Sequence, residues 1–366
     1  MLRGEITDNS TKAKISIALC TYNGAKYLPS QLESYLAQTY PPDEVAVCDD
    51  CSKDETVAIL NDFAGRSPFP VRVLVNEQNI GSTKNFEKVI SQCSGDIIFL
   101  CDQDDVWAPN KIERVINEFD RDHEVSMVFS DAEIVDESLQ PLGRNLSEAT
   151  GLTLERREIV KRGNLFSILL KGNIVAGATL AFRAEYNKAI IPIPTDIPDM
   201  IHDGWIAMVL SMTAKCVFLN EPLVKYRQHA EQQLGADPRG FARRAIKLSR
   251  INVMERIEKK HKTKKAYVES IKSHVISRLD VSDHILNAVN AEIDYHRDYV
   301  RHYQLRKVML SGKRVMRLRL IIKELLSGRY HRCSNGVRTA ARDFVVGHAR
   351  EIEYSELLYK GKAVID

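Results

Sequence analysis

The sequence lacks any long apolar run. No stretch of it approaches the ~18–20 apolar residues that are needed to cross a bilayer. Its first residues, MLRGEITDNSTKAK, also lack the apolar core of a secretory signal. We therefore expect a cytoplasmic protein. The composition, with 44% hydrophobic and 28% charged residues, is that of a globular chain with a substantial core.

Paired cysteine motifs are scarce as well. The seven cysteines are odd in number, and only Cys48 and Cys51 have the C-x-x-C spacing of a redox or zinc site. No second such pair completes a zinc site. The intervening Asp49 and Asp50 would raise the pKa of a thiol, because negative charge disfavours the thiolate. We expect these two cysteines to be reduced and structural.

Glycine-rich phosphate loops are missing from the first strand region. No G-x-G-x-x-G follows Cys20, so a dinucleotide-binding domain of that type is excluded. Sugar-nucleotide pyrophosphorylases also begin with a nucleotide-binding parallel sheet, but they need a Gly-rich loop here, and CTYNGAKYL is not one.

Charge is divided unevenly along the chain. Residues 239–366 hold 29 Lys and Arg against 14 Asp and Glu, whereas residues 1–238 hold 23 against 35. An acidic front and a basic rear indicate different partners for the two parts. Nucleic acid is not an expected partner, because the basic part has no interleaved aromatics and no reader motif.

Strand-like and helix-like segments alternate over the first 140 residues. This alternation predicts an α/β fold, with a mostly parallel sheet covered by helices on both faces. A capping box at Ser52–Glu55 and a cap at Ser82 or Thr83 would start two of the helices. The expected strands are 15–20, 44–48, 71–75, 96–101, 125–130, 179–182 and 216–226, and the expected helices are 26–38, 57–63, 82–92, 109–119 and 202–212.

Polar residues gather directly after three of these strands, at 21–23, 49–50 and 102–105. In parallel sheets the binding crevice lies beyond the carboxyl ends of the strands, so these residues are expected to share one site. Asp102 and Asp104, two residues apart, can converge on Mg²⁺ or Mn²⁺. An isolated D-x-D-D would be read as a solvated acidic turn, but its place after a buried strand favours a cation site.

Three segments together resemble a known family. ISIALCTYNGAKYLPSQLESYLAQTYPPDEVAVCDDCSKDET, NIGSTKNFEKVI and SGDIIFLCDQDDVWAPNKI are similar to the second family of glycosyltransferases, which are nucleotide-sugar enzymes with the A-type fold. The D-Q-D-D-V-W variant is most similar to bacterial rhamnosyltransferase-like members. The resemblance covers about residues 14–232.

The resemblance assigns a role to each matching position at the nucleotide. Asp50 would accept a hydrogen bond from the N–H of a pyrimidine base, Asp102 would lie by the ribose and metal, and Asp104 would ligate the metal. Lys84 would approach the nucleotide, although a surface lysine is an equal alternative. The base pocket would be lined by Thr21, Tyr22 and Asn23.

Further roles follow near the sugar and acceptor. Asp203 would be the catalytic base, with helix N-cap as its alternative role, and His229 would be a further metal ligand or hold the diphosphate. Arg227 would support the loop or lie near the sugar. We expect Trp107 in the core. The side chains expected near the sugars are Asp105, His202, Trp205 and Arg227.

The resemblance implies an inverting, metal-dependent transferase that uses a dTDP- or UDP-sugar and a lipid-linked or glycan acceptor. A non-catalytic scaffold or nucleotide-sugar-binding protein is the alternative. We expect an N-terminal extension at 1–13, a catalytic domain at 14–238 and a basic helical region at 239–366. Basic helical segments at 241–249, 286–306 and 315–326 suit an anionic bilayer at the inner face of the plasma membrane, or self-association.

Overall fold

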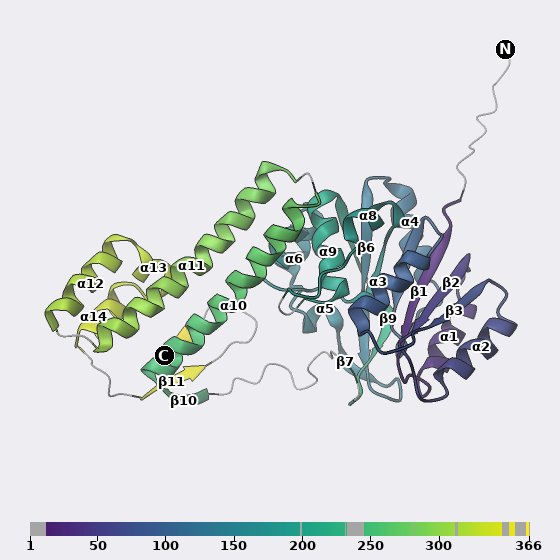
Figure 1. Cartoon of the computed structure of the whole chain (residues 1–366), viewed down its shortest axis with the longest axis horizontal. Coiled ribbons are helices and arrows are strands. Elements are labelled where there is room, and N and C mark those ends of the chain that lie inside the picture. Colours follow the sequence, from purple (N-terminus) through teal and green to yellow (C-terminus); the bar gives the residue numbers. More distant parts are fainter. Residues whose placement is uncertain are drawn as a thin grey trace, which may run out of the picture. The chain divides into compact units, whose positions relative to one another are not determined.

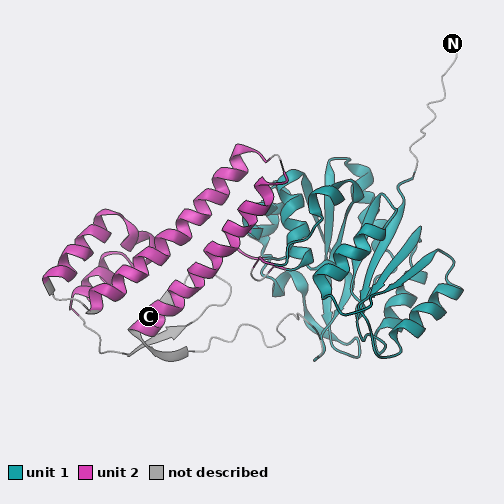
Figure 2. Cartoon of the chain, viewed as in Figure 1, with its two compact units in different colours: residues 1–169, 173–195, 201–236 teal, residues 170–172, 196–200, 237–366 magenta. Residues whose placement is uncertain are grey.

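The computed structural model divides into two compact units (Figure 2). Unit 1 comprises residues 1–169, 173–195 and 201–236, and unit 2 comprises residues 170–172, 196–200 and 237–366. Most of the expected N-terminal extension lies outside the described residues. The structure describes residues 12–197, 200–230, 232, 245–279, 281–311, 314–345, 351–355 and 364–365.

Unit 1 is built on one sheet with the strand order β3-β2-β1-β4-β8-β6-β9-β5, and β7 pairs with β6 (Figure 1). Strands β1 to β4 run parallel, β8 lies antiparallel between β4 and β6, and β6 is parallel to β9. The mostly parallel sheet that we expected is confirmed. The strands are β1 (Ile15–Thr21), β2 (Glu44–Asp49), β3 (Val71–Val75), β4 (Ile97–Cys101), β5 (Val106–Trp107), β6 (Val125–Val135), β7 (Pro141–Asn145), β8 (Leu180–Arg183) and β9 (Lys215–Arg227).

Every residue of β1, β2 and β4 is buried, as expected for strands with helices on both faces. Alternate residues such as Ile17, Val47 and Phe99 join a core with α1 (Leu28–Leu36), α2 (Thr56–Arg66) and α4 (Lys111–Arg121). Helix α3 (Ser82–Gln92) also packs on β1 and β2, and it contacts α9 (His202–Thr213). The shorter elements are α5 (Leu146–Ala149), α6 (Leu154–Lys161), α7 (Leu165–Leu169), η1 (Gly177–Thr179), η2 (Ala184–Tyr186) and α8 (Asn187–Ile190).

Two expected helix caps are wrong. Helix α2 begins at Thr56 after Glu55, and Ser52 instead donates its hydroxyl to Asp49, so no capping box forms. Helix α3 is preceded by Gly81 rather than by a capping serine or threonine. In both places the loop residues bind the end of β2, which displaces the helix starts that local propensity would choose.

Unit 2 is mainly helical. Its helices α10 (Arg250–Ile276) and α11 (Asp283–Ser311) form a hairpin (Figure 1), with Val253, Met254 and Tyr303 in a shared core. The expected helical segment at 241–249 is wrong in its described part, because β10 is a strand. The remaining elements are α12 (Arg314–Leu326), α13 (Arg329–Cys333), α14 (Val337–Val345), and the antiparallel strands β10 (Ala245–Ser249), β11 (Glu351–Ser355) and β12 (Val364–Ile365).

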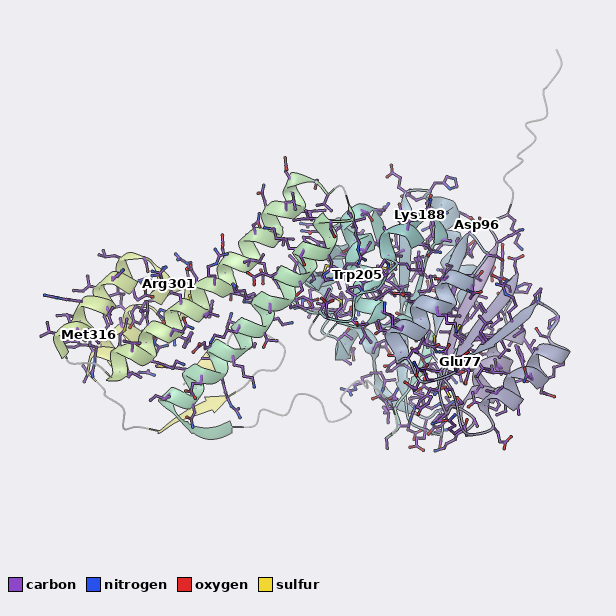
Figure 3. All side chains as sticks on the ribbon, viewed as in Figure 1. Glu77, Asp96, Lys188, Trp205, Arg301 and Met316 are labelled. Atoms are coloured by element: carbon purple, nitrogen blue, oxygen red, sulfur yellow. The ribbon has the colours of Figure 1, made fainter. Side chains whose placement is uncertain are left out.

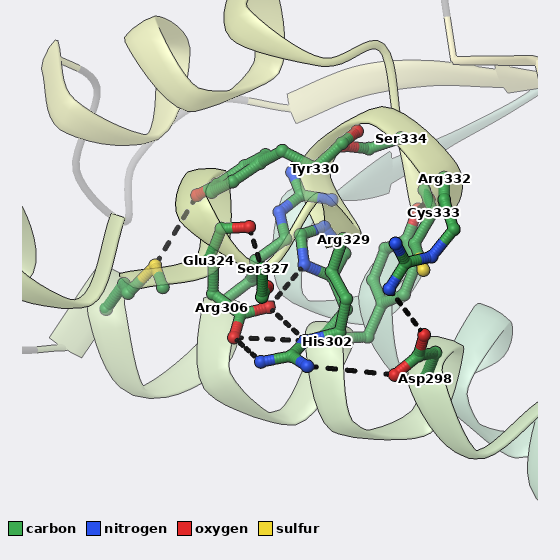
Figure 4. Close-up of polar contacts among 12 residues, drawn as sticks. Asp298, His302, Arg306, Glu324, Ser327, Arg329, Tyr330, Arg332, Cys333 and Ser334 are labelled. Atoms are coloured by element: carbon green, nitrogen blue, oxygen red, sulfur yellow. Dashed lines mark hydrogen bonds and ion pairs between the residues drawn. The ribbon is translucent and has the colours of Figure 1, made fainter. Parts of the chain in front are cut away.

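Buried ion pairs hold α11 to α14 together. Glu324 is fully buried and contacts His302 and Arg329 (Figure 4). Burial raises the pKa of Glu324, but the hydrogen bonds from His302 and Arg329 outweigh this and bring it to about 2. A second buried pair joins Arg306 Nε to Asp343 Oδ2 at 2.7 Å. These charges are tolerated because each has a partner.

Among the described residues, no helix is both long and apolar enough to span a membrane.

Replacing Asp343 with Ala should destabilise unit 2 by about 3–5 kcal/mol, because Arg306 would keep a buried charge without its partner. Urea unfolding followed by circular dichroism measures the change. The matched control is Asp294→Ala, which removes the exposed ion pair with Arg297 and should change stability by less than about 1 kcal/mol. Equal effects of the two substitutions would contradict the structural role of the buried pair.

Candidate functional site

The loops after β1 and β2 are bound to each other at the carboxyl edge of the sheet. Strand register places Thr21 opposite Asp49, and the Thr21 hydroxyl donates to Asp49 Oδ2 at 2.7 Å. Asn23, at a φ of 47°, donates its N–H to Ser52 Oγ, and its Oδ1 accepts from Lys53 N–H, both at 2.8 Å. Two of the three residues expected to line a base pocket therefore hold the loops in place.

The loop after β1 is also fastened to the loop after β4. Gln103 accepts from Tyr22 N–H at 2.8 Å and donates to the Tyr22 carbonyl at 2.9 Å. A Cβ on Gly24 would lie 2.1 Å from Gln103 Oε1, so a larger residue here would push the Gln103 amide away from Tyr22. The Tyr22 side chain remains 46% exposed at the edge of the sheet. Sequence reasoning missed Gln103, whose only signal was its place between two aspartates.

Asp50 fixes the segment that leads into α3. Its Oδ1 accepts from Asn76 Nδ2 and Ile80 N–H at 2.8 Å, and its Oδ2 accepts from Gly81 N–H at 2.9 Å. The carboxylate is buried. Its expected contact with a base N–H stays a prediction, which would use a remaining lone pair of the same oxygens.

Lys84 points along its own helix and toward the segment after α8. Its Nζ donates to Glu87 Oε2 and to the Ile193 carbonyl, each at 2.9 Å. These two contacts hold Lys84 within the protein, so an approach to a nucleotide would require its side chain to change partners.

Asp102, Asp104 and Asp105 follow β4, and two of them, Asp102 and Asp105, have raised pKa values. Burial raises the pKa of Asp102 to about 8, assisted by the negative charges of Asp104 and Asp203. Burial, together with Asp104 and Asp102, also raises the pKa of Asp105 well above its ordinary value. Such a cluster holds a proton or a cation in preference to full negative charge.

The pairing of β5 with β9 brings the 102–105 loop beside residues 226–229. Asp104 Oδ2 lies 2.8 Å from His229 Nε2, and the His229 ring packs 4.5 Å from that of Tyr27. Among the described residues, no three His, Cys, Asp or Glu side chains form a ready-made metal cage. The expected ligands Asp104 and His229 thus meet, whereas Asp102 does not complete a three-residue cage with them.

This donor set still fits Mg²⁺ or Mn²⁺. These ions need few protein oxygens when phosphate oxygens and waters complete the coordination shell. Burial and the charges of Asp104 and Asp203 raise the pKa of Asp102 even though Lys111 lowers it, so a bound cation would favour the charged carboxylate. The buried Nδ1 of His229 has no hydrogen-bond partner among the described residues.

Two side chains expected near a sugar contact protein groups. Arg227 is buried, and its guanidinium donates to the carbonyls of Asp104 and Glu137 and to Ser30 Oγ. Asp105 is buried and accepts from Arg227 N–H at 3.0 Å. The sugar contacts expected of Arg227 and Asp105 stay predictions: the Arg227 guanidinium is engaged with protein groups, whereas Asp105 Oδ2 has no hydrogen-bond partner among the described residues. The alternative role of Arg227 as a support of the loop agrees with these contacts.

His202 and Trp205 are likewise in the core. The His202 ring stacks on Phe86 at 3.7 Å, and burial lowers the pKa of His202 to about 3, so the ring is neutral. Trp205, labelled in Figure 3, is fully buried and donates its indole N–H to the Ile190 carbonyl at 2.8 Å. The expected sugar-side positions of both are wrong, because the first turns of α9 are buried on every side. Trp107 is in the core, as expected.

Asp203 lies in the first turn of α9, and Ile201 precedes the helix as N-cap, so Asp203 does not cap it. Its Oδ1 accepts from Asn173 Nδ2 and its Oδ2 from Gly177 N–H, each at 3.0 Å. Burial raises the pKa of Asp203 to about 6, although these donors and Gly204 N–H lower it. A carboxylate with this pKa is suited to take a proton near neutral pH.

Sequence reasoning missed two further groups at the site. Asn173 lies in an irregular stretch, and nothing in its sequence context pointed to Asp203. Lys111 is fully buried, donates to the Ala178 carbonyl at 2.7 Å and lies 3.7 Å from the Trp107 ring centre. Burial lowers the pKa of Lys111 to about 7, although the nearby Cys101, Asp105 and Asp102 oppose this shift.

Replacing Asn173 with Ala should raise the pKa of Asp203 above about 6, because the charged carboxylate loses a donor. Carbon-detected NMR of the Asp203 carboxyl during a pH titration measures this. The control is Asn145→Ala, which removes a donor from a different buried carboxylate, Asp131, and should leave the titration of Asp203 unchanged. A titration of Asp203 that is the same in both variants would refute the positioning role of Asn173.

Comparison with solved structures gives two similar chains. TarS of S. aureus, in a complex with UDP-GlcNAc, is 16% identical with a TM-score of 0.49, and the match covers 96% of this chain and 98% of that chain. A mannosyltransferase of Pyrobaculum calidifontis, in a complex with GDP-Man and Mn²⁺, is 14% identical with a TM-score of 0.49, covering 92% and 88%.

Comparison with known sequences gives relatives that match over part of their length. An uncharacterised protein of Mycobacterium tuberculosis is 29% identical over 220 residues, which are 59% of this chain and 59% of that protein. An uncharacterised glycosyltransferase of Nostoc is 25% identical over 217 residues, which are 59% of this chain and 65% of that protein. The matches thus span less than two thirds of these relatives.

The family comparison agrees with the geometry. Residues 16–190 match the model of glycosyl transferase family 2. The mostly parallel sheet, the carboxylates after β4 and the helical C-terminal region are those expected of an A-type glycosyltransferase. Residues 16–190 of unit 1 are therefore similar to the glycosyl transferase family 2 domain.

Proposed function

We propose that this glycosyltransferase inverts the sugar it transfers, moving it from a nucleotide-diphospho-sugar to a hydroxyl of a lipid-linked or glycan acceptor. The observation that carries this proposal is Asp203. It is a buried carboxylate with a pKa of about 6, held by Asn173 and Gly177, and near enough to Asp102 to raise its pKa. A single displacement requires one proton acceptor, here Asp203, beside groups that can bind a cation, here the carboxylates after β4.

In this reaction Asp203 takes the proton of the acceptor hydroxyl, and the oxygen of that hydroxyl attacks the anomeric carbon. The bond between that carbon and the diphosphate oxygen breaks, and its electron pair leaves with the nucleoside diphosphate. The attack comes from the face opposite the leaving group, so the configuration inverts. Asn173 and Gly177 N–H hold the carboxylate in place and favour its charged form before the proton arrives.

We propose that Asp104, Asp102 and His229 hold Mg²⁺ or Mn²⁺ together with the donor diphosphate. The ion supplies positive charge that stabilises the departing diphosphate. Asp104 Oδ2 and His229 Nε2, which lie 2.8 Å apart, would both face such an ion, and its charge would favour the deprotonated form of Asp102.

The donor is proposed to be a dTDP- or UDP-sugar, with rhamnose as the sugar. The exposed Tyr22 ring at the end of β1 offers a face for a pyrimidine base, and Asp50 lies at the end of the neighbouring strand. The rhamnose assignment rests on the resemblance of the D-Q-D-D-V-W segment at residues 102–107. We place the reaction at the inner face of the plasma membrane, where a lipid-linked acceptor is held.

Replacing Asp203 with Asn should lower the rate of transfer by about 10²–10⁴-fold, because the amide cannot accept the proton. Donor binding should be unchanged. Release of nucleoside diphosphate from a panel of UDP-, dTDP- and GDP-sugars with a glycan acceptor measures turnover, and calorimetry measures donor binding. The control Asp62→Asn changes a well-exposed carboxylate of α2 and should keep full turnover. Retained turnover in Asp203→Asn would refute the assignment of the base. If the wild type released no nucleoside diphosphate from any donor, a non-catalytic binding protein would be favoured.

The transfer rate should rise with pH and level off above pH 7, with a midpoint near the Asp203 pKa of about 6. The sign follows because only the deprotonated carboxylate accepts a proton, so activity is lost as pH falls through this pKa. The measurement is kcat/KM over a pH series in buffers of constant ionic strength. A profile that is flat through this range would contradict a base with the pKa of Asp203.

Replacing Asp104 with Ala should remove the metal-dependent part of donor affinity. Donor titrations with and without Mn²⁺ compare it with wild type, and Asp120→Ala on the exposed side of α4 serves as the control. We expect the wild type and the control to bind the donor more tightly with Mn²⁺, and Asp104→Ala to show no such gain. An equal gain in all three proteins would exclude Asp104 as a ligand.

A further inference from the structure

Helix α12 in unit 2 packs Ile321 into a core and exposes other aliphatic side chains. It buries the charged Arg317 and Glu324, and it exposes aliphatic side chains, with Val315 69% and Leu326 85% exposed. Residues spaced by three and four lie on one side of a helix, so the exposed aliphatic residues form a continuous stripe. We call this the α12 stripe; it consists of Val315, Leu318, Ile322 and Leu326.

The charge beside the α12 stripe is entirely positive. Arg319 and Lys323 are exposed along one side of it, and neither has an ion-pair partner among the described residues. The segment 314–345 contains only two acidic residues, Glu324 and Asp343, and both are fully buried in ion pairs. Its exposed basic residues are Arg319, Lys323, Arg332, Arg338 and Arg342.

Neighbouring elements of unit 2 carry further exposed apolar and basic side chains. Helix α14 packs on α12 and exposes Phe344 and Val345 together with basic residues. Between α11 and α12, a hollow of about 220 Å³ is lined by Arg301, Lys323 and the ion-paired Glu324, beside apolar side chains that include Val308 and Leu320. Figure 3 labels Arg301 on α11 and Met316 on α12. The hollow therefore offers two cations next to the apolar stripe.

We propose that α12 lies on a bilayer containing anionic lipids. The α12 stripe enters the boundary between headgroups and acyl chains, while Arg319, Lys323 and Arg301 meet the lipid phosphates. A second copy of the chain is a poorer occupant, because two such surfaces would bring cations together without any exposed carboxylate on the described part of 314–345 to offset them. This proposal rests on the proposed function. The membrane contact would hold the enzyme where a lipid-linked acceptor is present.

Co-sedimentation of the full chain with lipid vesicles tests the proposal without any sugar transfer. We expect binding to vesicles of phosphatidylcholine mixed with phosphatidylglycerol, and weak binding to pure phosphatidylcholine. Binding should fall as salt is added, because the phosphate contacts are screened. No binding of the wild type to the anionic vesicles would overturn the proposal.

Two double variants separate the apolar and ionic parts of the contact. Ile322→Glu with Leu326→Glu should weaken binding at least about tenfold by removing aliphatic surface from the bilayer. Arg319→Glu with Lys323→Glu should weaken binding to anionic vesicles by roughly tenfold or more, since each cation contributes to attraction. The matched control is Leu154→Glu, an equally drastic change at a residue of unit 1 that is 79% exposed.

All substitutions are at exposed positions, and circular dichroism checks that each variant is folded. If the control binds as wild type and both double variants bind weakly, the proposal is supported. If the variants bind as wild type, or if light scattering shows that they only dissociate a dimer, the proposal is overturned. Release of nucleoside diphosphate from soluble substrates should be unchanged in these variants, so a failed vesicle test and a failed transferase assay remain distinct results.

Discussion

Repulsion among carboxylates at one edge of the sheet governs the organisation of unit 1. The parallel strands deliver Asp102, Asp104 and Asp105 to the place where α9 presents Asp203, and burial prevents water from screening them. Burial, and after it the charge of the neighbouring carboxylates, raises the pKa values of Asp102 and Asp105. Much of the surrounding structure restrains these groups: Arg227 N–H and His229 contact two of them, and Lys111 lies buried close by. A site with this charge balance is prepared for a ligand that brings positive charge with it.

The sheet could be predicted because buried parallel strands have a simple sequence pattern. Ile15–Thr21, Glu44–Asp49 and Ile97–Cys101 are short apolar runs that end in polar residues, and the strand register follows from them. Helix starts could not be predicted equally well. Ser52 satisfies every local rule for a cap, yet its hydroxyl binds Asp49 across the loop, because tertiary hydrogen bonds compete with local ones.

At the candidate site, the residue types could be predicted from the sequence, but the orientation and the partners of their side chains could not. Asp203 could be singled out by its place in the sequence, whereas its support by Gly177 N–H involves a backbone group that has no sequence signal. Trp205 follows two residues later, but a helix buried on all sides turns that side chain into the core. In unit 2 the apolar residues of α12 suggested a core-facing helix as readily as a surface one, and the choice was made by the buried ion pairs of Glu324.

The close approach of Gly24 to Gln103 links two positions that are far apart in the chain. Any side chain at position 24 would occupy the space of the Gln103 amide, which in turn holds the backbone of Tyr22. A larger residue at 24 would therefore displace the Gln103 amide or require a shorter residue at 103, and the loop after β1 would then need another anchor. In the evolutionary record of this lineage, the two positions should change together or stay fixed together, so that their covariation reports the junction between the two loops.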